Sequence, residues 1–240
     1  MLNFNGTKYH PEQEMKMKPI LFVFHEKDSA GGFIDDFCRI LKRPILVCRP
    51  RFGDKLPSFE EIQSAIIFGG KMSVNDTLDW KKKEMEWIEK SMLNSLPMLG
   101  ICLGAQMMAH ILGESICPIA QEQIECGYYP IKPIDKCMSG ISKVYHWHRE
   151  RFDLPKGATL LAQGQDVCPI QAFKWNQAIG VQFHPEIKKS IMLRWSMRDK
   201  NDLEKPGARP LETHFHDHDI YHASVQKWLQ FSVFSHLDIK

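Results

Sequence analysis

The sequence lacks the features that mark a secreted, membrane-spanning or fibrous protein. Residues 1–17 carry Lys8, Glu12, Glu14 and Lys16 and hold no apolar run of about seven residues, which argues against a signal peptide or a spanning helix there. No segment repeats along the chain, and no linker divides it into independent domains. We therefore expect a cytoplasmic globular protein with no membrane partner.

An excess of charge of one sign is also missing. Lysine and arginine number 31 against 29 for aspartate and glutamate, which leaves a net charge of +2. This balance provides no broad electrostatic attraction for nucleic acid or for an anionic membrane. We therefore expect no nucleic-acid partner.

Paired cysteines are absent as well. The chain has seven cysteines, an odd number, and no Cys-x-x-Cys pair, which fits a reducing compartment and argues against a disulfide framework or a zinc knuckle. We expect neither a bound metal nor a cofactor. Six of the cysteines have no motif beside them and are interpreted as packing residues: Cys38, Cys48, Cys117, Cys126, Cys137 and Cys168.

Short apolar runs alternate with amphipathic segments in the first half of the chain. The runs at 19–25, 44–49, 64–70 and 97–102 are typical of strands covered on both faces of a parallel sheet. The segments at 32–41, 80–93 and 103–112 have helical periodicity. This alternation predicts an α/β fold of three layers, with helices flanking an open, mostly parallel sheet.

After Gly113 the strand-like pieces become shorter and are separated by turn residues. They lie at 128–131, 142–147, 158–162, 169–174 and 178–183, and they either extend the sheet in a mixed fashion or form a small antiparallel layer. Two helices are expected to follow, at 188–198 and from 219 to about 236. We treat 1–18 as an N-terminal extension and 19–240 as one domain. The apolar face of the last helix is either core or interface: Trp228, Leu229, Phe231 and Phe234.

Cys102 has the surroundings of a reactive cysteine. It ends an apolar run and precedes a helical segment, with Gly100 and Gly104 two residues away on either side. A nucleophile elbow needs such small neighbours because the chain turns sharply from strand to helix. The turn places the sulfur at a helix N-terminus, which favours the thiolate, and aims the Leu103 amide at a developing oxyanion. The alternative is a buried core cysteine beside two glycines that pack a helix.

A second motif supplies a base for this thiol. His184 and Glu186 stand two residues apart around Pro185, and in an extended segment both side chains would share one face. The carboxylate can then orient the imidazole that activates the thiol. The alternative is a surface turn without a chemical role.

Together these motifs make the chain resemble the class I glutamine amidotransferases, in particular stand-alone members similar to the glutaminase part of GMP synthase. The matching segments fall in the family's order between about Ile20 and Glu186: 68–76, 100–106, 145–148 and 182–186. The resemblance implies a flavodoxin-like fold with Cys102 as nucleophile, His184 as general base and acid, and Glu186 as the residue that orients His184.

The resemblance also implies roles for residues outside the triad. Gly69 and Gly70 would supply an oxyanion amide in addition to that of Leu103. The pocket for the substrate's α-amino and α-carboxylate groups would be lined by Gln106, Trp147, His148, Arg149 and Glu150. Two positions depart from the family pattern: Lys71 stands where a proline is frequent, and Arg149-Glu150 stands where larger synthetases have smaller or apolar residues.

The activity implied by the resemblance is hydrolysis of the glutamine side-chain amide through a cysteinyl thioester. A γ-glutamyl peptidase would use the same chemistry on peptides or conjugates, and a non-catalytic regulatory module would keep only the fold. A chain of 240 residues has room for about one domain. A synthetase that accepts the ammonia would therefore be a separate protein.

Three further features have a plain interpretation. His214, His216, His218 and His222 could face a metal, but we interpret 214–218 as part of a solvated, Pro-rich loop that leads into the last helix, which Asp217 and Asp219 are suited to cap. Lys81, Lys82 and Lys83 alternate with glutamates and are expected on a solvated helix face. His25 ends the first strand and could border the active-site edge.

Overall fold

A central sheet organises the chain. The computed structural model describes residues 17–165 and 167–239, so most of the expected extension at 1–18 lies outside the described residues. Within them, an eight-stranded sheet has the order β2-β1-β3-β4-β12-β11-β10-β7. Its strands are β1 (Ile20–Val23), β2 (Ile45–Cys48), β3 (Ser64–Ile67), β4 (Met98–Ile101), β7 (Lys132–Pro133), β10 (Thr159–Gln163), β11 (Ile170–Trp175) and β12 (Ala178–Val181).

The sheet is parallel over most of its width. Strands β2, β1, β3, β4 and β12 run parallel, and β11, β10 and β7 continue the sheet in antiparallel fashion. The predicted α/β fold with a mostly parallel sheet is therefore confirmed. The two alternatives for the second half of the chain, a mixed extension of the sheet and a small antiparallel layer, both hold in part. Strands β11, β10 and β7 extend the sheet, whereas β6 (Glu125–Pro130) and β8 (Lys143–His148) form a separate antiparallel ribbon. A third, short pair consists of β5 (Cys117–Pro118) and β9 (Glu150–Arg151).

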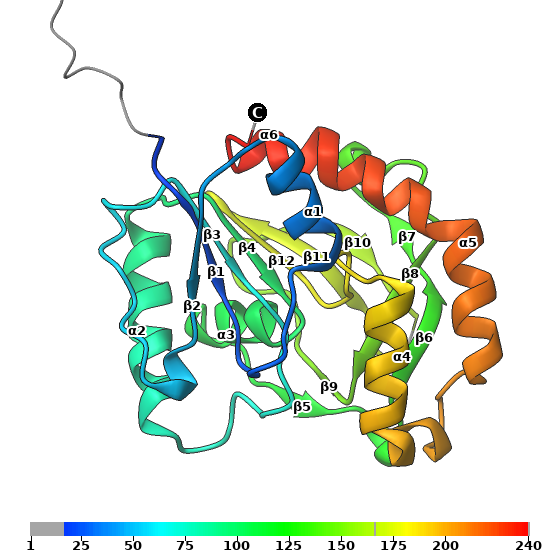
Figure 1. Cartoon of the computed structure of the whole chain (residues 1–240). Helices are drawn as coiled ribbons and strands as arrows, with labels where there is room; N and C mark the ends of the chain where they lie inside the picture. The colour runs from blue at the N-terminus through cyan, green and yellow to red at the C-terminus, as the bar shows by residue number, and fades with distance from the viewer. Residues whose placement is uncertain (1–16, 166, 240) are drawn as a thin grey trace, which may run out of the picture.

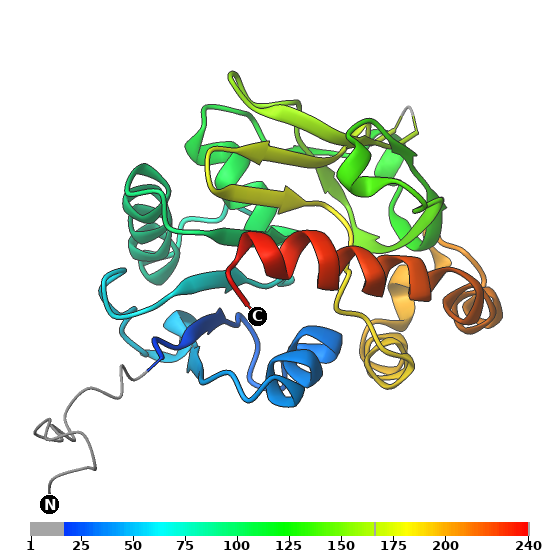
Figure 2. The same ribbon diagram turned by 90° about the horizontal axis from the view of Figure 1, so that it is seen from above.

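Helices cover both faces of the sheet (Figures 1 and 2). One face carries α1 (Gly32–Ile40), α5 (Leu211–Trp228) and α6 (Phe234–His236), and the other carries α2 (Asp79–Leu93) and α3 (Leu103–Ile111). Successive strand side chains point to opposite faces, so Ile20 and Phe22 join the core under the first group while Leu21 and Val23 join the core under the second. Helix α4 (Lys189–Arg198) packs beside the β6–β8 ribbon.

Short helical turns complete the described chain. They are η1 (Pro50–Phe52), η2 (Ala120–Glu122), η3 (Lys136–Met138), η4 (Lys200–Glu204) and the π-helical η5 (Leu229–Val233). None of the helices in the described part is long and apolar enough to span a bilayer.

The last long helix begins eight residues earlier than expected. Helix α5 starts at Leu211 rather than near 219, so the histidines from 214 to 218 lie within the helix and the capping role expected for Asp217 and Asp219 is wrong. Burial of side chains on this helix outweighs the capping signal in the sequence, since His214 and His222 are both inside the protein. The apolar residues further along divide between core and surface: Trp228, Leu229 and Phe234 are buried, and Phe231 is exposed.

Two expectations about polar and sulfur side chains are wrong in part. Lys82 and Lys83 are exposed as expected, and four of the six cysteines interpreted as packing residues are buried: Cys38, Cys48, Cys126 and Cys168. Lys81 and Glu84 on α2 are buried instead of solvated: the Lys81 ammonium donates to the carbonyls of Ser73 and Val74, at 2.7 Å each. Cys117 and Cys137, interpreted as packing residues, are exposed because they lie on a short edge strand and in a 3₁₀ turn.

Candidate active site

Cys102 lies in a strained turn between β4 and α3. Its backbone has φ 50° and ψ −105°, a combination that a residue with a side chain rarely adopts. The turn needs both neighbouring glycines: a Cβ on Gly100 would lie 2.7 Å from the backbone of Gly104, and one on Gly104 would lie 2.3 Å from the Ile67 carbonyl oxygen. The local geometry is that of the nucleophile elbow expected from the sequence.

His184 and Glu186 follow β12, the strand next to β4. The strand ends at Val181, and residues 184–187 form a turn closed by the Ile187 amide and the His184 carbonyl at 3.4 Å. The extended segment expected here is therefore wrong, yet the turn brings His184 Nδ1 within 2.8 Å of Glu186 Oε1. The His184 ring also lies edge-on against Trp195 of α4.

The three side chains are electrostatically coupled in a buried site. Burial lowers the pKa of His184, but the Glu186 carboxylate and then the Cys102 side chain raise it to about 10. The imidazolium form is thereby favoured at neutral pH. An adjacent imidazolium is the usual stabiliser of a reactive thiolate.

Gly69 and Gly70 lie opposite Cys102, in a loop after β3 that we call the glycine loop (residues 68–71). A Cβ on Gly69 would lie 2.8 Å from His184 Cε1, and one on Gly70 would lie 2.9 Å from both His25 and Leu103. Only glycine fits such close approaches without a shift. Within the described residues, neither the Gly70 nor the Leu103 amide has a recorded acceptor, so both N–H groups are available to a bound oxygen.

His25 touches the other side of the glycine loop. It is fully buried just after β1, with Nδ1 3.2 Å from the Gly69 carbonyl oxygen and Nε2 2.9 Å from Glu84 Oε1. His25 therefore borders the active-site edge as expected, but it does so by contacting the backbone of the glycine loop and not by facing the pocket.

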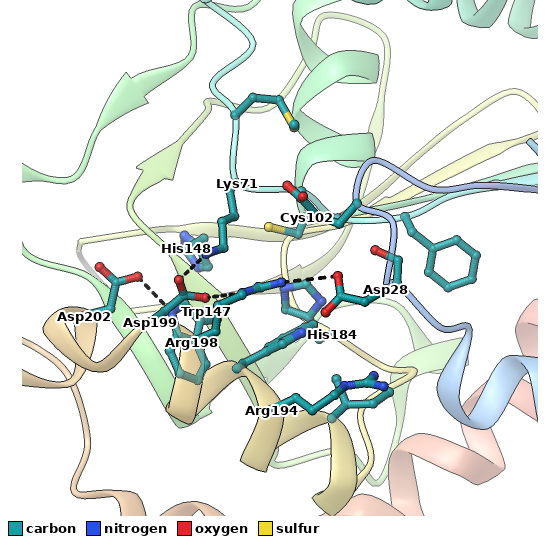
Figure 3. Close-up of a pocket in the computed structure, with 18 of the residues that line it drawn as sticks. Asp28, Lys71, Cys102, Trp147, His148, His184, Arg194, Arg198, Asp199 and Asp202 are labelled. Atoms are coloured by element: carbon teal, nitrogen blue, oxygen red, sulfur yellow. Dashed lines mark hydrogen bonds and ion pairs between the residues drawn. The ribbon is translucent and has the colours of Figure 1, made fainter. Parts of the chain in front are cut away.

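A cavity of about 550 Å³ opens over Cys102. Figure 3 shows Cys102 and His184 in this pocket with Trp147 and charged side chains from α4 and the following turn. An ion pair joins separate segments at its rim, because Arg198 contacts Asp28 at 3.8 Å. Arg198 also contacts its chain neighbour Asp199 at 2.9 Å. Lys71 also pairs with Asp199.

The five residues expected to bind substrate all line this cavity: Gln106, Trp147, His148, Arg149 and Glu150. Most of their polar atoms are held by other parts of the protein. Gln106 donates to the Glu150 carbonyl at 3.3 Å, Trp147 donates to Asp202 at 3.0 Å, and Arg149 donates to the Lys71 carbonyl at 3.0 Å. Trp147 is thus a pocket wall, and direct substrate contacts by these side chains stay a prediction.

A buried cluster behind this wall has the composition of a metal site. Glu125, His146 and His148 are the one such group found in residues 17–165 and 167–239. Glu125 Oε2 contacts His148 Nε2 at 2.9 Å and the Gln171 amide nitrogen at 3.2 Å. Burial would raise the pKa of Glu125, but the two histidines outweigh it and lower it to about 2. The carboxylate is thus already occupied by protein groups. The four histidines considered from the sequence as possible metal ligands form no such group within the described chain: His214, His216, His218 and His222.

Several residues around the pocket are not evident from the motifs. Arg194 and Arg198 could have been found from their spacing of four on a helix, which places both on one face. Glu84 carries no such signal, because its pairing with His25 joins positions far apart in the sequence.

A family model described as glutamine amidotransferase class-I matches residues 51–194, a segment that contains Cys102, His184 and Glu186. The chain belongs to the class I glutamine amidotransferase family. Members of this family are typically cysteine-dependent hydrolases.

Related proteins carry the same family name or that of a glutamine-hydrolysing enzyme. YfeJ of Salmonella typhimurium, named as glutamine amidotransferase-like, is 29% identical over 181 residues, 69% of this chain and 74% of that protein. One glutamine-hydrolysing GMP synthase subunit, from Sulfurisphaera tokodaii, is 32% identical over 130 residues, 51% of this chain and 67% of that protein. A crystal structure of a glutamine amidotransferase from Thermotoga maritima matches 93% of this chain and 99% of its own, with 26% identity and a TM-score of 0.84.

Proposed function

We propose that this amidotransferase-family protein hydrolyses the side-chain amide of glutamine through a thioester on Cys102. The observation that carries the proposal is the placement of Cys102 in a strained elbow beside His184, which Glu186 holds at 2.8 Å. This arrangement joins an activated thiol, a proton carrier and an orienting carboxylate in one cavity.

The reaction proceeds in two stages. The Cys102 thiolate attacks the amide carbon, and the negative oxygen of the tetrahedral intermediate is bound by the Gly70 and Leu103 amides. His184 gives its proton to the nitrogen, ammonia leaves, and a thioester remains. His184 then takes a proton from water, whose oxygen attacks the thioester. The carbon–sulfur bond then breaks, which releases glutamate and leaves the Cys102 thiolate beside protonated His184.

Replacement of the nucleophile tests the proposal. Cys102→Ala and Cys102→Ser should lose nearly all release of ammonia and glutamate, and both should resist labelling by a glutamine-like electrophile. Cys48→Ala is the matched control, because Cys48 is buried in the core of the sheet at the end of β2. Wild-type turnover in Cys102→Ala would contradict the proposal. Failure of wild-type Cys102 to react with any mild electrophile would favour the regulatory module.

The size of the cavity favours a second candidate substrate. A volume of about 550 Å³ lies in the range of roughly 300–1,000 Å³ that is typical of clefts for drug-sized ligands. Such a cleft has room for a γ-glutamyl peptide or conjugate beyond the glutamyl group. Arg194 lines this cavity and is exposed, without a recorded ion pair among the described residues, so it could bind a carboxylate on the leaving amine.

Comparing substrates separates these candidates. Glutamine and γ-glutamyl dipeptides with a free carboxylate should be compared by kcat/KM. If the peptides are the substrates, Arg194→Ala should lower their kcat/KM and leave that for glutamine unchanged. Arg39→Ala on α1, where the side chain is 72% exposed and pairs with Asp35, is the control. Equal loss for both substrates would argue against the peptide site.

The fate of the ammonia depends on the same comparison. If glutamine is the preferred substrate, we propose that a separate synthetase accepts the ammonia, and adding that protein should raise the rate of glutamine hydrolysis. If γ-glutamyl compounds are preferred, the hydrolysis products themselves are the purpose of the reaction, and no acceptor protein is needed.

A further inference from the structure

His25 and Glu84 form a buried pair that contacts the active site only through the backbone. Both side chains are fully buried, and they lie on different elements, His25 after β1 and Glu84 on α2. The proposed reaction uses neither of them. Buried charged groups of this kind are costly unless they are paired, which raises the question of what the pair does.

Each nitrogen of the His25 ring faces an acceptor. Nδ1 lies 3.2 Å from the Gly69 carbonyl oxygen, and Nε2 lies 2.9 Å from the Glu84 carboxylate. Carbonyl and carboxylate oxygens only accept, so both ring nitrogens donate. Burial lowers the pKa of His25, but Glu84 and the carbonyls of Gly69 and Phe68 outweigh it and raise the pKa above its ordinary value. The doubly protonated ring therefore fits this position.

The bond to Gly69 fixes the orientation of the next peptide group. In a trans peptide the carbonyl of one residue and the N–H of the next point in opposite directions, and the described chain contains no cis peptide. When His25 holds the Gly69 carbonyl, the Gly70 N–H points away from His25. The Gly70 N–H has no recorded acceptor among the described residues, and Gly69 lies directly against His184 and Cys102.

We propose that His25, held in place by Glu84, is a positioning residue that orients the Gly69–Gly70 peptide so that the Gly70 N–H binds the oxyanion. This role rests on the proposed amide hydrolysis. Glycine is otherwise free to rotate this peptide, and a rotated peptide would present a carbonyl oxygen to the developing negative charge. A fixed donor avoids that reorganisation during the reaction.

A double variant removes the bond with little change in volume. His25→Phe with Glu84→Met replaces both buried partners by apolar groups, a change that is tolerated better than leaving one charge unpaired. Loss of one oxyanion donor typically costs about 10²- to 10³-fold in kcat, so we expect kcat for a chromogenic γ-glutamyl anilide to fall by about 10²-fold with little change in KM. The single variant His25→Gln keeps a donor for the Gly69 carbonyl, so its kcat should lie between those of the double variant and the wild type.

Alkylation by iodoacetamide separates positioning from general damage. Displacement of iodide by the Cys102 thiolate forms no oxyanion, so the double variant should alkylate Cys102 at the wild-type rate while its turnover falls. His110→Ala, an exposed histidine at the end of α3, is the control for both assays. If the double variant does not fold, Glu84→Gln serves instead, and its kcat should fall while alkylation is retained.

Two results would overturn the inference while leaving the proposed function intact. In the first, the wild-type enzyme is active and the His25 and Glu84 variants keep its kcat. In the second, the variants lose both turnover and alkylation of Cys102. A wild-type protein that alkylates at Cys102 but cleaves no γ-glutamyl amide would overturn the proposed function and this role with it.

Discussion

At Cys102 the backbone takes φ 50° and ψ −105° while the residue is only 5% exposed. Strain of this kind costs on the order of 1–3 kcal/mol and persists only where the surroundings enforce it. Here they do so through Gly100 and Gly104, which allow β4 and α3 to approach closely enough for the turn. The sequence predicts this turn because the glycine spacing itself encodes the steric requirement.

Removal of the Glu186 charge should change the pH dependence of the reaction. Glu186→Gln keeps the size of the side chain but removes the charge that raises the pKa of His184. The imidazolium then loses its proton at lower pH, so the alkaline limb of kcat/KM should move to lower pH, and activity should fall roughly 10²- to 10⁴-fold. A pH profile of kcat/KM is the measurement. An unchanged alkaline limb would show that Glu186 does not control His184.

A methyl group at Gly69 should disturb catalysis without unfolding the protein. The added Cβ would lie 2.8 Å from His184 Cε1, so His184 must move, and a displacement of about 1 Å can cost roughly 10²-fold in rate. Gly140→Ala is the control, because the backbone there has φ +86° and an added Cβ would have nothing within 4 Å. It should reduce thermal stability and leave kcat at the wild-type value. Equal kcat for the two variants would argue against the close approach at Gly69.

Among the elements, prediction from sequence succeeds where one local cause decides the structure. The strands β1, β3 and β4 are short apolar runs buried on both faces, and that pattern is visible in the chain. The start of α5 is not predictable in this way. Its first turns contain buried His214, whose Nε2 donates to the Arg209 carbonyl just before the helix and whose Nδ1 lies 3.2 Å from the Tyr145 hydroxyl. Tyr145 comes from β8, far away in the sequence.

In the C-terminal helical segment, the buried aromatic side chains should stabilise the fold and the exposed one should not. Trp228 is 4% exposed and its ring lies 5.8 Å from that of Phe183, whereas Phe231 is 75% exposed. Trp228→Ala should lower the free energy of unfolding by about 3–5 kcal/mol, and Phe231→Ala should change it by less than about 0.5 kcal/mol. Denaturant unfolding measures both. A large effect at Phe231 would indicate that a partner covers this side chain.

For the whole molecule, the stability should fall as the solution becomes acidic. Burial, with a smaller effect of His218, lowers the pKa of His222 to about 3, whereas an unfolded histidine has a pKa of about 6.5. Between these values the unfolded chain binds a proton that the folded protein does not, so the free energy of unfolding decreases as pH falls. By this relation His222 alone should cost about 2 kcal/mol at pH 5.

A non-titrating side chain at this position tests that effect. His222→Gln should flatten the decrease in unfolding free energy between about pH 7 and pH 5. Part of the decrease should remain, because burial also lowers the pKa of His146 to about 3. Val225→Ala on the same helix is the control, since it destabilises the protein without removing a titrating group and should keep the wild-type slope. A slope in His222→Gln equal to that of the wild type would contradict the assignment.

The whole candidate site is only partly predictable from sequence, because it is assembled at the scale of the molecule. The triad and the glycine loop belong to motifs with fixed local spacing, and they are found in the chain directly. The pairing of His25 with Glu84 and the rim contact of Arg198 with Asp28 join segments that only the folded sheet brings together. Such contacts leave no periodic signal in one sequence.

The pairing of β4 with β12 has a consequence for biosynthesis. Cys102, the proposed nucleophile, follows β4, and His184, its proposed base, follows β12. These strands are adjacent in the sheet although much of the chain separates them. During translation Cys102 therefore leaves the ribosome long before His184 exists. Its thiol lacks an activating imidazole until the later strand inserts beside the earlier one. By the proposed mechanism, completion of the sheet is the event that activates this cysteine, and a nascent chain that ends before β12 would lack the activated thiol.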